Sequence, residues 1–213
     1  MPRFITAEQG TPEWHQARLG CLTASRMKDA LDYTAKGAEG AKRKQLKLDL
    51  MAETFTGQPT PVFVNGAMKW GTETEPEARI AYSSATGNDV EQVGFCLHDS
   101  IPYFGCSPDG LVGDDGMVEI KCPASSTMVQ WLIYGVIPED HIPQLITQCA
   151  VAGRKWVDFV AFDPRMAEPY RMFIRRFTPT PEQIEEVEAE ARKIARDMKE
   201  MYAQIQQTIG GGK

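Results

Sequence analysis

Apolar and polar residues alternate with a helical period over several stretches of the chain. Thr11 followed by Pro12 is a capping residue with proline in the first turn, so a short helix is predicted at about 12–19. Thr23 can cap a second helix that ends near Leu31. The same periodicity predicts helices at about 42–56, at about 66–86 with a kink or restart near Pro76, at about 125–135 and at about 139–152.

The clearest helical pattern is at the C-terminal end, at about 181–208. Seven apolar side chains recur there at spacings of three and four: Ile184, Val187, Ala191, Ile194, Met198, Met201 and Ile205. A stripe of this kind more often packs on its own domain than on another subunit. Both interpretations remain open at this point.

Short apolar runs predict the strands. They lie at about 90–97, at about 103–107, on both sides of Gly113-Asp114-Asp115-Gly116, at Trp156–Phe162 and at Tyr170–Phe177. The glycine and aspartate cluster is a tight-turn signal, so the two runs around it should form a β-hairpin. The order of elements predicts an α/β or α+β class with a mixed central β-sheet flanked by helices.

The hairpin carries the candidate chemistry. Asp109 opens one arm, and Glu119, Ile120 and Lys121 lie on the other. Because side chains alternate along a strand, Glu119 and Lys121 should share a face while Ile120 points into the core. Two hard oxygen ligands suit Mg²⁺ or Mn²⁺, and a nearby lysine can hold or help deprotonate an attacking water. The alternative is an ordinary hairpin with charged residues on its wet face, but its apolar neighbours favour a metal, since buried charge needs a partner.

Composition limits the remaining possibilities. With 213 residues, 42% of them hydrophobic, the chain should form one domain over residues 1–213, with a core at about 10–178 and the tail helix after it. The formal net charge of −6 means that any DNA contact must be local. Five cysteines without a C-x-x-C pair argue against a disulfide framework, a zinc site or an iron–sulfur cluster. No signal stretch or bilayer-length apolar run is present in the sequence, so a soluble, cytoplasmic protein is expected.

Residues 34–45 form a basic segment within this acidic chain. Lys36, Lys42, Arg43 and Lys44 accompany two glycines there, which predicts a mobile loop leading into a helix. Such a loop is usually only solvated charge. In an acidic protein it is also a candidate for touching a phosphate backbone.

Several blocks of the sequence occur together in a known order. Pro108-Asp109 followed by Glu119-Ile120-Lys121 resembles the PD-(D/E)-x-K signature of restriction-endonuclease-like nucleases. The surrounding chain, over most of residues 10–165, resembles the phage lambda exonuclease or YqaJ-type viral recombinase family. The blocks are Trp14-His15-Gln16-Ala17-Arg18-Leu19-Gly20, Thr23-Ala24-Ser25, Trp70-Gly71 with Glu75 and Ala78-Arg79, Cys106-Ser107-Pro108-Asp109-Gly110-Leu111, Glu119-Ile120-Lys121-Cys122-Pro123, Gln144, and Asp163-Pro164-Arg165-Met166.

This resemblance implies a restriction-endonuclease-like fold and a Mg²⁺-dependent exonuclease, for which Mn²⁺ can substitute. It implies that the Asp109 and Glu119 side chains and the Ile120 carbonyl bind the metal, and that Lys121 serves the attacking water. By position, Glu75 and Gln144 would support the metal site, although Pro76 directly follows Glu75 and is expected to change its geometry. Further residues would grip a 5′ phosphate or the scissile strand, namely Arg18, Ser25 and Ser107. Without the resemblance, Arg18 reads as a surface ion-pair partner, Ser25 as a turn residue and Gln144 as a solvated side chain.

The same resemblance implies digestion of double-stranded DNA from the 5′ end, leaving a 3′ single strand for a single-strand annealing protein. It also implies a ring-shaped homotrimer of phage or prophage origin, working in the cytoplasm of a bacterial host cell and without a membrane. Three alternatives stay open: a restriction-like endonuclease or repair nuclease, a non-enzymatic DNA-end-binding adaptor, and a metal hydrolase for a small phosphoester.

Overall fold

The computed structural model describes residues 2–61 and 63–210. The helices are α1 (Pro12–Arg18), α2 (Met27–Ala30), α3 (Ala41–Thr56), α4 (Gly66–Thr86), α5 (Ser125–Tyr134), α6 (Ile142–Ala152) and α7 (Pro181–Gly210), with 3₁₀ turns at Ala24–Arg26 and Glu139–His141. The strands are β1 (Arg3–Ile5), β2 (Leu22–Thr23), β3 (Phe95–Leu97), β4 (Phe104–Cys106), β5 (Gly110–Val112), β6 (Gly116–Lys121), β7 (Trp156–Phe162) and β8 (Met172–Phe177). The predicted α/β class is confirmed.

The described strands form two four-stranded mixed sheets, where the sequence predicted one. The first has the order β1-β3-β4-β2 and the second the order β5-β6-β7-β8. In the second sheet, β6 pairs antiparallel with β5 and parallel with β7. A β-bridge between Glu91 and Leu111 connects the segment before β3 to β5. The hairpin with the candidate metal ligands therefore stands where the two sheets meet.

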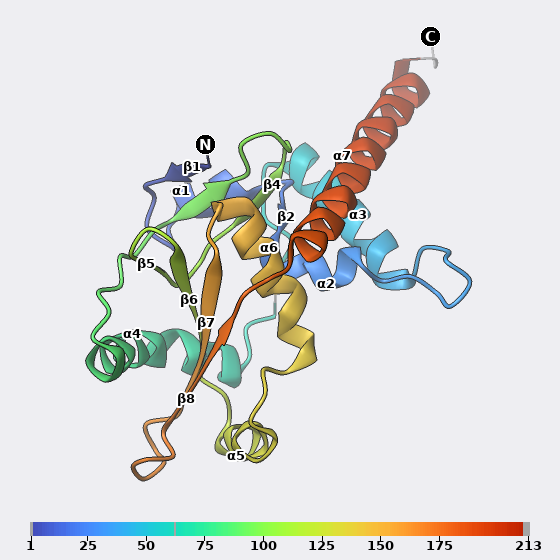
Figure 1. The fold of residues 1–213 in the computed structure, drawn as a ribbon. Helices are drawn as coiled ribbons and strands as arrows, with labels where there is room; N and C mark the ends of the chain where they lie inside the picture. The colour runs from blue at the N-terminus through green and yellow to red at the C-terminus, as the bar shows by residue number, and fades with distance from the viewer. Residues whose placement is uncertain (1, 62, 211–213) are drawn as a thin grey trace.

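Helices cover both faces of the β5–β8 sheet (Figure 1). On one face, Ala78 and Tyr82 of α4 pack in a cluster with Val118 and Ile120. On the other face, Met117 and alternate residues of β7 pack in the main core with α6 and α7. Burial on both faces explains why the run Trp156–Phe162 is almost continuously apolar. It also means that every side chain of β6 up to Ile120 is buried.

The first half of α7 packs on its own domain. Val187, Ala191 and Ile194 are each 2% exposed and belong to the main core. Figure 1 shows the C-terminal half of α7 extending away from the body of the molecule. The apolar stripe predicted at about 181–208 is therefore satisfied within the chain over its first half.

Several local predictions need correction. Thr23 does not cap a helix with its side chain, because it lies in β2 and its hydroxyl is 3.3 Å from that of Ser25. Pro76 does not restart a helix, since α4 runs through it as one element. The strand expected at about 90–97 is confined to Phe95–Leu97, and β1 was not predicted.

Arg43, which was predicted to belong to the basic loop, is only 2% exposed. Its guanidinium bonds to Glu190 of α7, to Glu39 and to the carbonyl oxygen of Ala30. A buried arginine needs such paired acceptors to offset desolvation. Arg43 therefore ties α3 to α7 and is not available to a phosphate backbone.

No helix within the described residues is long and apolar enough to cross a membrane.

Candidate active site

The β5–β6 hairpin brings Asp109 next to Ile120. Gly113 begins the turn with a φ of 53°, a conformation that glycine adopts without strain. β5 pairs with β6 only as far as the Gly110–Val118 pair, so the backbone of β6 beyond that point has no strand beside it there. The Asp109 carboxylate fills this place, because its Oδ2 accepts a hydrogen bond from the Ile120 amide at 2.6 Å. In a strand the carbonyl of a residue points to the same edge as its amide, so the Ile120 carbonyl faces the side of Asp109.

Glu119 lies on the opposite face of β6 from Ile120 and shares that face with Lys121, as predicted. The Glu119 side chain is 2% exposed. Its Oε1 accepts hydrogen bonds from Lys121 Nζ and from Gln144 Nε2, the latter at 2.6 Å. Lys121 is 29% exposed, so its ammonium joins the buried carboxylate to the surface. Gln144 is half-buried at the start of α6 and not a solvated surface residue.

Glu75 reaches the site from α4. Its Oε1 accepts a hydrogen bond from Arg79, one helical turn later, and Arg79 Nε also donates to the carbonyl oxygen of Asp109 at 3.1 Å. Arg79 thus connects Glu75 to the backbone at Asp109. Because α4 is continuous through Pro76, Glu75 and Arg79 keep the spacing of one helix face.

Three carboxylates influence one another in this arrangement. Burial, together with the negative charges of Glu119 and Glu75, holds the pKa of Asp109 well above its usual range. Burial likewise raises the pKa of Glu75, with Arg79 acting in the opposite direction and the charge of Glu119 in the same one. Burial alone would lower the pKa of Lys121, but the charges of Glu119 and Asp109 outweigh it and raise that pKa. The ammonium of Lys121 is therefore retained, while burial and the neighbouring carboxylates disfavour the ionised forms of Asp109 and Glu75.

The donor set fits a hard divalent cation. Asp109 and Glu119 supply carboxylate oxygens, and the Ile120 carbonyl supplies a neutral oxygen between them in sequence. The described residues contain no group of three or more His, Cys, Asp or Glu side chains arranged to hold a metal ion. Magnesium does not require one, since it keeps several waters and commonly takes only one or two protein carboxylates. Burial, and after it the charges of Glu119 and Glu75, raise the pKa of Asp109, and a bound cation would favour its ionised form.

Arg18 and Ser107 are brought together by Trp14. The Arg18 guanidinium lies 3.9 Å from the centroid of the Trp14 ring, and Trp14 Nε1 donates to Ser107 Oγ at 3.0 Å. Arg18 is half-buried and forms no ion pair with any described residue. It is therefore not the surface ion-pair partner that would be expected without the family resemblance. Burial lowers the pKa of Arg18 to about 10, which still leaves the group charged at neutral pH. A half-buried arginine fork without an ion-pair partner, close to a hydroxyl, is suited to an anion with several oxygens.

Ser25 leaves the first sheet at the same end as Ser107. β2 and β4 are parallel, and Thr23 pairs with Gly105. Ser25 follows Thr23 in the 3₁₀ turn Ala24–Arg26, and Ser107 directly follows β4, so both serines come after the same end of two neighbouring strands. Ser107 is also two residues before Asp109. Trp14 thus connects Arg18 to Ser107, and Ser107 leads through Pro108 to the predicted metal ligand Asp109. No hydrogen bond between described residues joins Arg18, Ser25 and Ser107 directly.

Sequence reasoning missed two residues that touch the site. Gln148 Nε2 donates to Glu119 Oε2 at 2.5 Å, and Arg79 contacts both Glu75 and Asp109. The spacing of four between Gln144 and Gln148 places both amides on one face of a helix and could have identified the second from the first. Arg79 stood in a recognised block, but its role depends on a backbone carbonyl, which a sequence does not reveal.

The block Asp163-Pro164-Arg165-Met166 has a structural explanation. Asp163 is 0% exposed and accepts hydrogen bonds from Ser125 Oγ at 2.6 Å and from Arg165 Nε at 2.7 Å. Arg165 also donates to the carbonyl oxygen of Pro123 and lies over the Trp70 ring. These contacts fix the start of α5 and the end of β6 against α4, and so they support the site from outside.

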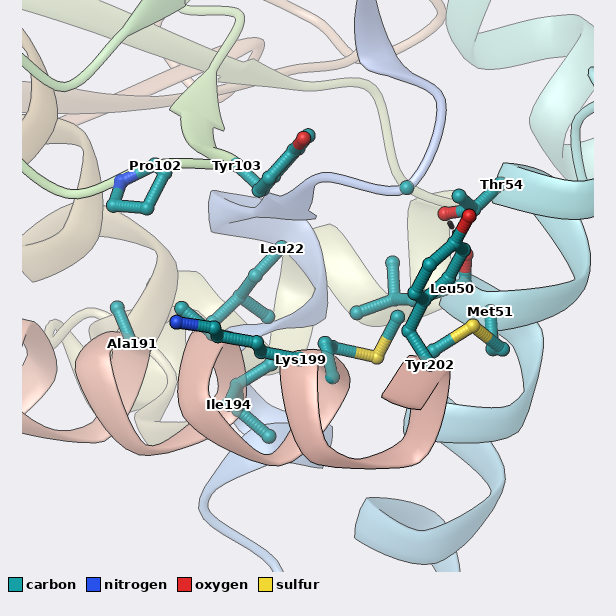
Figure 2. A pocket seen from close by; sticks show the side chains of 13 residues that line it. Leu22, Leu50, Met51, Thr54, Pro102, Tyr103, Ala191, Ile194, Lys199 and Tyr202 are labelled. Carbon is teal, nitrogen blue, oxygen red and sulfur yellow. Dashed lines mark hydrogen bonds between the residues drawn. The ribbon is translucent and has the colours of Figure 1, made fainter. Parts of the chain in front are cut away.

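An apolar cavity of about 480 Å³ lies elsewhere, between α3, α7 and the turn before β4 (Figure 2). Its walls include Leu50, Met51, Ile194 and Tyr202, and Lys199 is its single charged lining residue. None of the predicted site residues lines it. Its chemistry is that of packing between two helices, so the candidate active site is the cluster around β6.

The chain is similar to known proteins in both sequence and fold. The family model described as YqaJ-like viral recombinase domain matches residues 13–155. Two crystal structures of LHK-Exo, an alkaline exonuclease from Laribacter hongkongensis, one of them in complex with dAMP, are each 36% identical over 94% of this chain and 99% of that one, with a TM-score of 0.87. A phage-related exonuclease from Haemophilus somnus 129PT, 10% identical over 87% of this chain and 96% of that one, has a TM-score of 0.64 and shares the fold. No curated protein sequence matches the chain.

Proposed function

The chain belongs to the YqaJ-like viral recombinase domain family, and we propose that it is a Mg²⁺-dependent exonuclease that digests one strand of linear double-stranded DNA from the 5′ end. The observation that carries this proposal is the meeting of Asp109, Glu119 and Lys121 around the end of β6. It is supported by LHK-Exo, which is described as an alkaline exonuclease and has been crystallised with dAMP. A nucleoside monophosphate is the product that an exonuclease releases.

In this proposal the metal is held by the Asp109 and Glu119 carboxylates and the Ile120 carbonyl, with Mn²⁺ able to replace Mg²⁺. The bound cation supplies a Lewis acid that polarises the phosphodiester and its attacking water. Lys121 contributes a fixed positive charge beside the reacting phosphate, because its raised pKa keeps it protonated. Gln144 holds Glu119 in place by donating to its carboxylate. Glu75 supports Asp109 through Arg79, which bonds to both residues.

The proposed 5′ end selection rests on Arg18, Ser25 and Ser107. Arg18 offers a charged fork without a protein partner, and the two serines offer hydroxyl donors at the shared end of β2 and β4. Because Ser107 is two residues from Asp109, a phosphate held there would fix the distance from the DNA end to the metal. By binding the 5′ phosphate, these three residues would both select the DNA end and position it at the metal.

The remaining parts of the proposal come from the family resemblance. We propose that residues 1–213 form a single nuclease domain, since one core cluster includes residues from Leu22 to Ile194. A ring-shaped trimer would gather positive side chains around DNA and so reconcile a net charge of −6 with a polyanionic substrate. The 3′ single strand left behind would be taken by a single-strand annealing protein, in the cytoplasm of a bacterial host.

Digestion of a linear duplex labelled at either the 5′ or the 3′ end tests the proposal. With Mg²⁺, the 5′ label should be released first as a mononucleotide, and excess chelator should stop the reaction. A covalently closed plasmid should remain intact. Cutting of the plasmid would support a restriction-like or repair endonuclease instead, whereas end binding without any turnover would support an adaptor. Hydrolysis of a nucleotide monoester alone would indicate a small-phosphoester hydrolase.

A further inference from the structure

Two glutamines of α6 hold the two oxygens of one buried carboxylate. Gln144 Nε2 donates to Glu119 Oε1 at 2.6 Å, and Gln148 Nε2 donates to Glu119 Oε2 at 2.5 Å. The two glutamines are four residues apart and so lie one above the other on the helix. Gln148 is 0% exposed, which places it entirely inside the protein. Each oxygen of the Glu119 carboxylate is therefore held by one glutamine of α6.

Glu119 Oε2 has an acceptor position left for another partner, whereas Oε1 has none. A carboxylate offers about two acceptor positions on each oxygen. Oε1 uses both, because Lys121 and Gln144 donate to it. Oε2 uses one, for Gln148. The remaining position is therefore on Oε2, and its direction depends on how Gln148 orients the carboxyl group.

The amide of Gln148 is itself incompletely satisfied. Its Oε1 is buried and has no hydrogen-bond partner among the described residues. Rotating the amide would bring this oxygen against the Glu119 carboxylate, where two acceptors would repel each other. The orientation of Gln148 is thus imposed by Glu119, at the expense of an unpaired buried carbonyl, which proteins generally avoid.

Packing alone does not explain a glutamine at this position. The neighbouring α6 residues Leu145, Ile146, Cys149 and Val151 are buried and apolar or weakly polar, and belong to the same core. An apolar side chain of similar length would fill the space without an unpaired oxygen. What glutamine adds is a single donor aimed at Glu119 Oε2. Local rules of folding are most often broken in this way at functional sites.

We propose that Gln148 is a positioning residue that orients Glu119 Oε2 toward the divalent cation. This inference rests on the proposed function, because it assigns Glu119 the role of metal ligand. Gln148 acts through Glu119 and touches neither DNA nor metal itself. Gln144 and Lys121 both donate to Glu119 Oε1. Among the described residues, Gln148 alone donates to Oε2, the oxygen that has an acceptor position left.

The test compares Gln148→Met, which keeps the length of the side chain and removes the donor, with the parent protein. Thr147→Val is the matched control, because Thr147 is equally buried on α6 and bonds only to the carbonyl of Pro143. The affinity for Mn²⁺ is measured without DNA, from the electron paramagnetic resonance signal of free Mn²⁺. We expect Gln148→Met to bind Mn²⁺ about 10- to 100-fold more weakly, the range found when a residue behind a metal ligand is removed. Thr147→Val should bind as the parent does.

Kinetics separate positioning from general damage. In Gln148→Met the Mg²⁺ concentration for half-maximal digestion should rise by a similar factor, while the rate at saturating Mg²⁺ should return to within a few-fold of the parent. Binding of DNA ends in chelator should be unchanged. If Gln148→Met does not fold, Gln148→Asn replaces it, since its amide is one methylene too short to reach Glu119. Parental Mn²⁺ affinity in whichever variant folds would overturn the inference. Failure of the parent itself to bind Mn²⁺ would instead overturn the proposed function.

Discussion

The backbone amide of Ile120 donates a hydrogen bond to the carboxylate of Asp109 at 2.6 Å. A loop residue thereby completes the edge of β6 at the point where β5 ends. The bond keeps Asp109 beside the Ile120 carbonyl, so two of the proposed metal ligands are fixed by a single local contact. Since Glu119 directly precedes Ile120 in the strand, the register of β6 sets the position of the third proposed ligand.

Asp109→Ala and Glu119→Ala should each abolish nuclease activity, because either change leaves the cation under-coordinated beside a charged phosphate. Both variants should still bind DNA ends. The rate of digestion of an end-labelled duplex measures the effect. More than about a tenth of the parental rate in either variant would contradict the assignment, since removing a ligand should cost more than the roughly 10- to 100-fold of a residue behind it.

Asp109→Asn should separate activity from stability. Asparagine can still accept the Ile120 hydrogen bond, so the strand edge is kept. In chelator at pH 8 we expect the Tm of this variant to equal or exceed that of the parent, because an ionised Asp109 is disfavoured by burial and by neighbouring charges. Mg²⁺ should raise the Tm of the parent only. A marked loss of stability in chelator would show that the negative charge of Asp109 supports the fold.

The raised pKa values of Asp109 and Glu75 predict how stability depends on pH. An acid with a raised pKa binds its proton more tightly in the folded than in the unfolded state, so stability in chelator should fall as pH rises from the unfolded pKa, about 4, through the folded one. Metal binding needs the deprotonated groups and should strengthen over the same interval. Thermal unfolding from pH 4 to 8, with chelator and with Mg²⁺, should show a growing difference. A difference that is constant over pH would contradict this prediction.

Lys121→Ala should lower the rate by about 10²- to 10⁴-fold, the range for a positioned charge or proton-transfer group, with little change in Mn²⁺ affinity. Lys121→Arg should rescue poorly, because a planar fork does not replace a compact ammonium beside Glu119. Single-turnover digestion with saturating Mg²⁺ provides the measurement. An alanine variant as fast as the parent would make Lys121 a surface charge.

A duplex with one phosphorylated and one hydroxyl 5′ end should be digested mainly from the phosphorylated end. Arg18→Ala should remove most of that preference, because Arg18 is the charged donor of the proposed phosphate site. Arg192→Ala is a suitable control, since Arg192 is an exposed arginine paired with Glu188 on α7. Equal rates from both ends in the parent protein, or release from the 3′ ends, would show that this polarity does not apply to the chain.

The part of the site that the sequence predicted is the part that local geometry determines. Asp109 and the run Glu119-Ile120-Lys121 lie in one hairpin, whose turn residues and alternation are visible in the order of amino acids. Gln148 was missed because its partner is 29 residues away and its significance depends on an unpaired amide oxygen. Arg43 was misjudged for a similar reason, since the carboxylate that buries it, Glu190, is 147 residues away.

The fold shows the same limit. Long apolar periodicity located the helices well, including α7, because each helix is stabilised by its own backbone bonds and one buried stripe. The division of the strands into two sheets was not predicted, since β1 pairs with β3, and the paired residues Ile5 and Phe95 are far apart in the sequence. A strand of three residues shows too little alternation of apolar and polar side chains to predict its pairing partner.

The proposed metal ligand Glu119 and the lysine beside it belong to a strand bonded to β7 along its entire length, from Gly116 to Lys121. Opening such a strand requires breaking the sheet that forms the core, so backbone amides here should exchange with solvent only through cooperative unfolding. The proposed catalytic groups on β6 should consequently lose their arrangement only when the domain unfolds. Heat should inactivate the protein at the temperature where the whole domain unfolds, so substitutions that stabilise the core away from Glu119 and Gln148 should raise the temperature of inactivation as well.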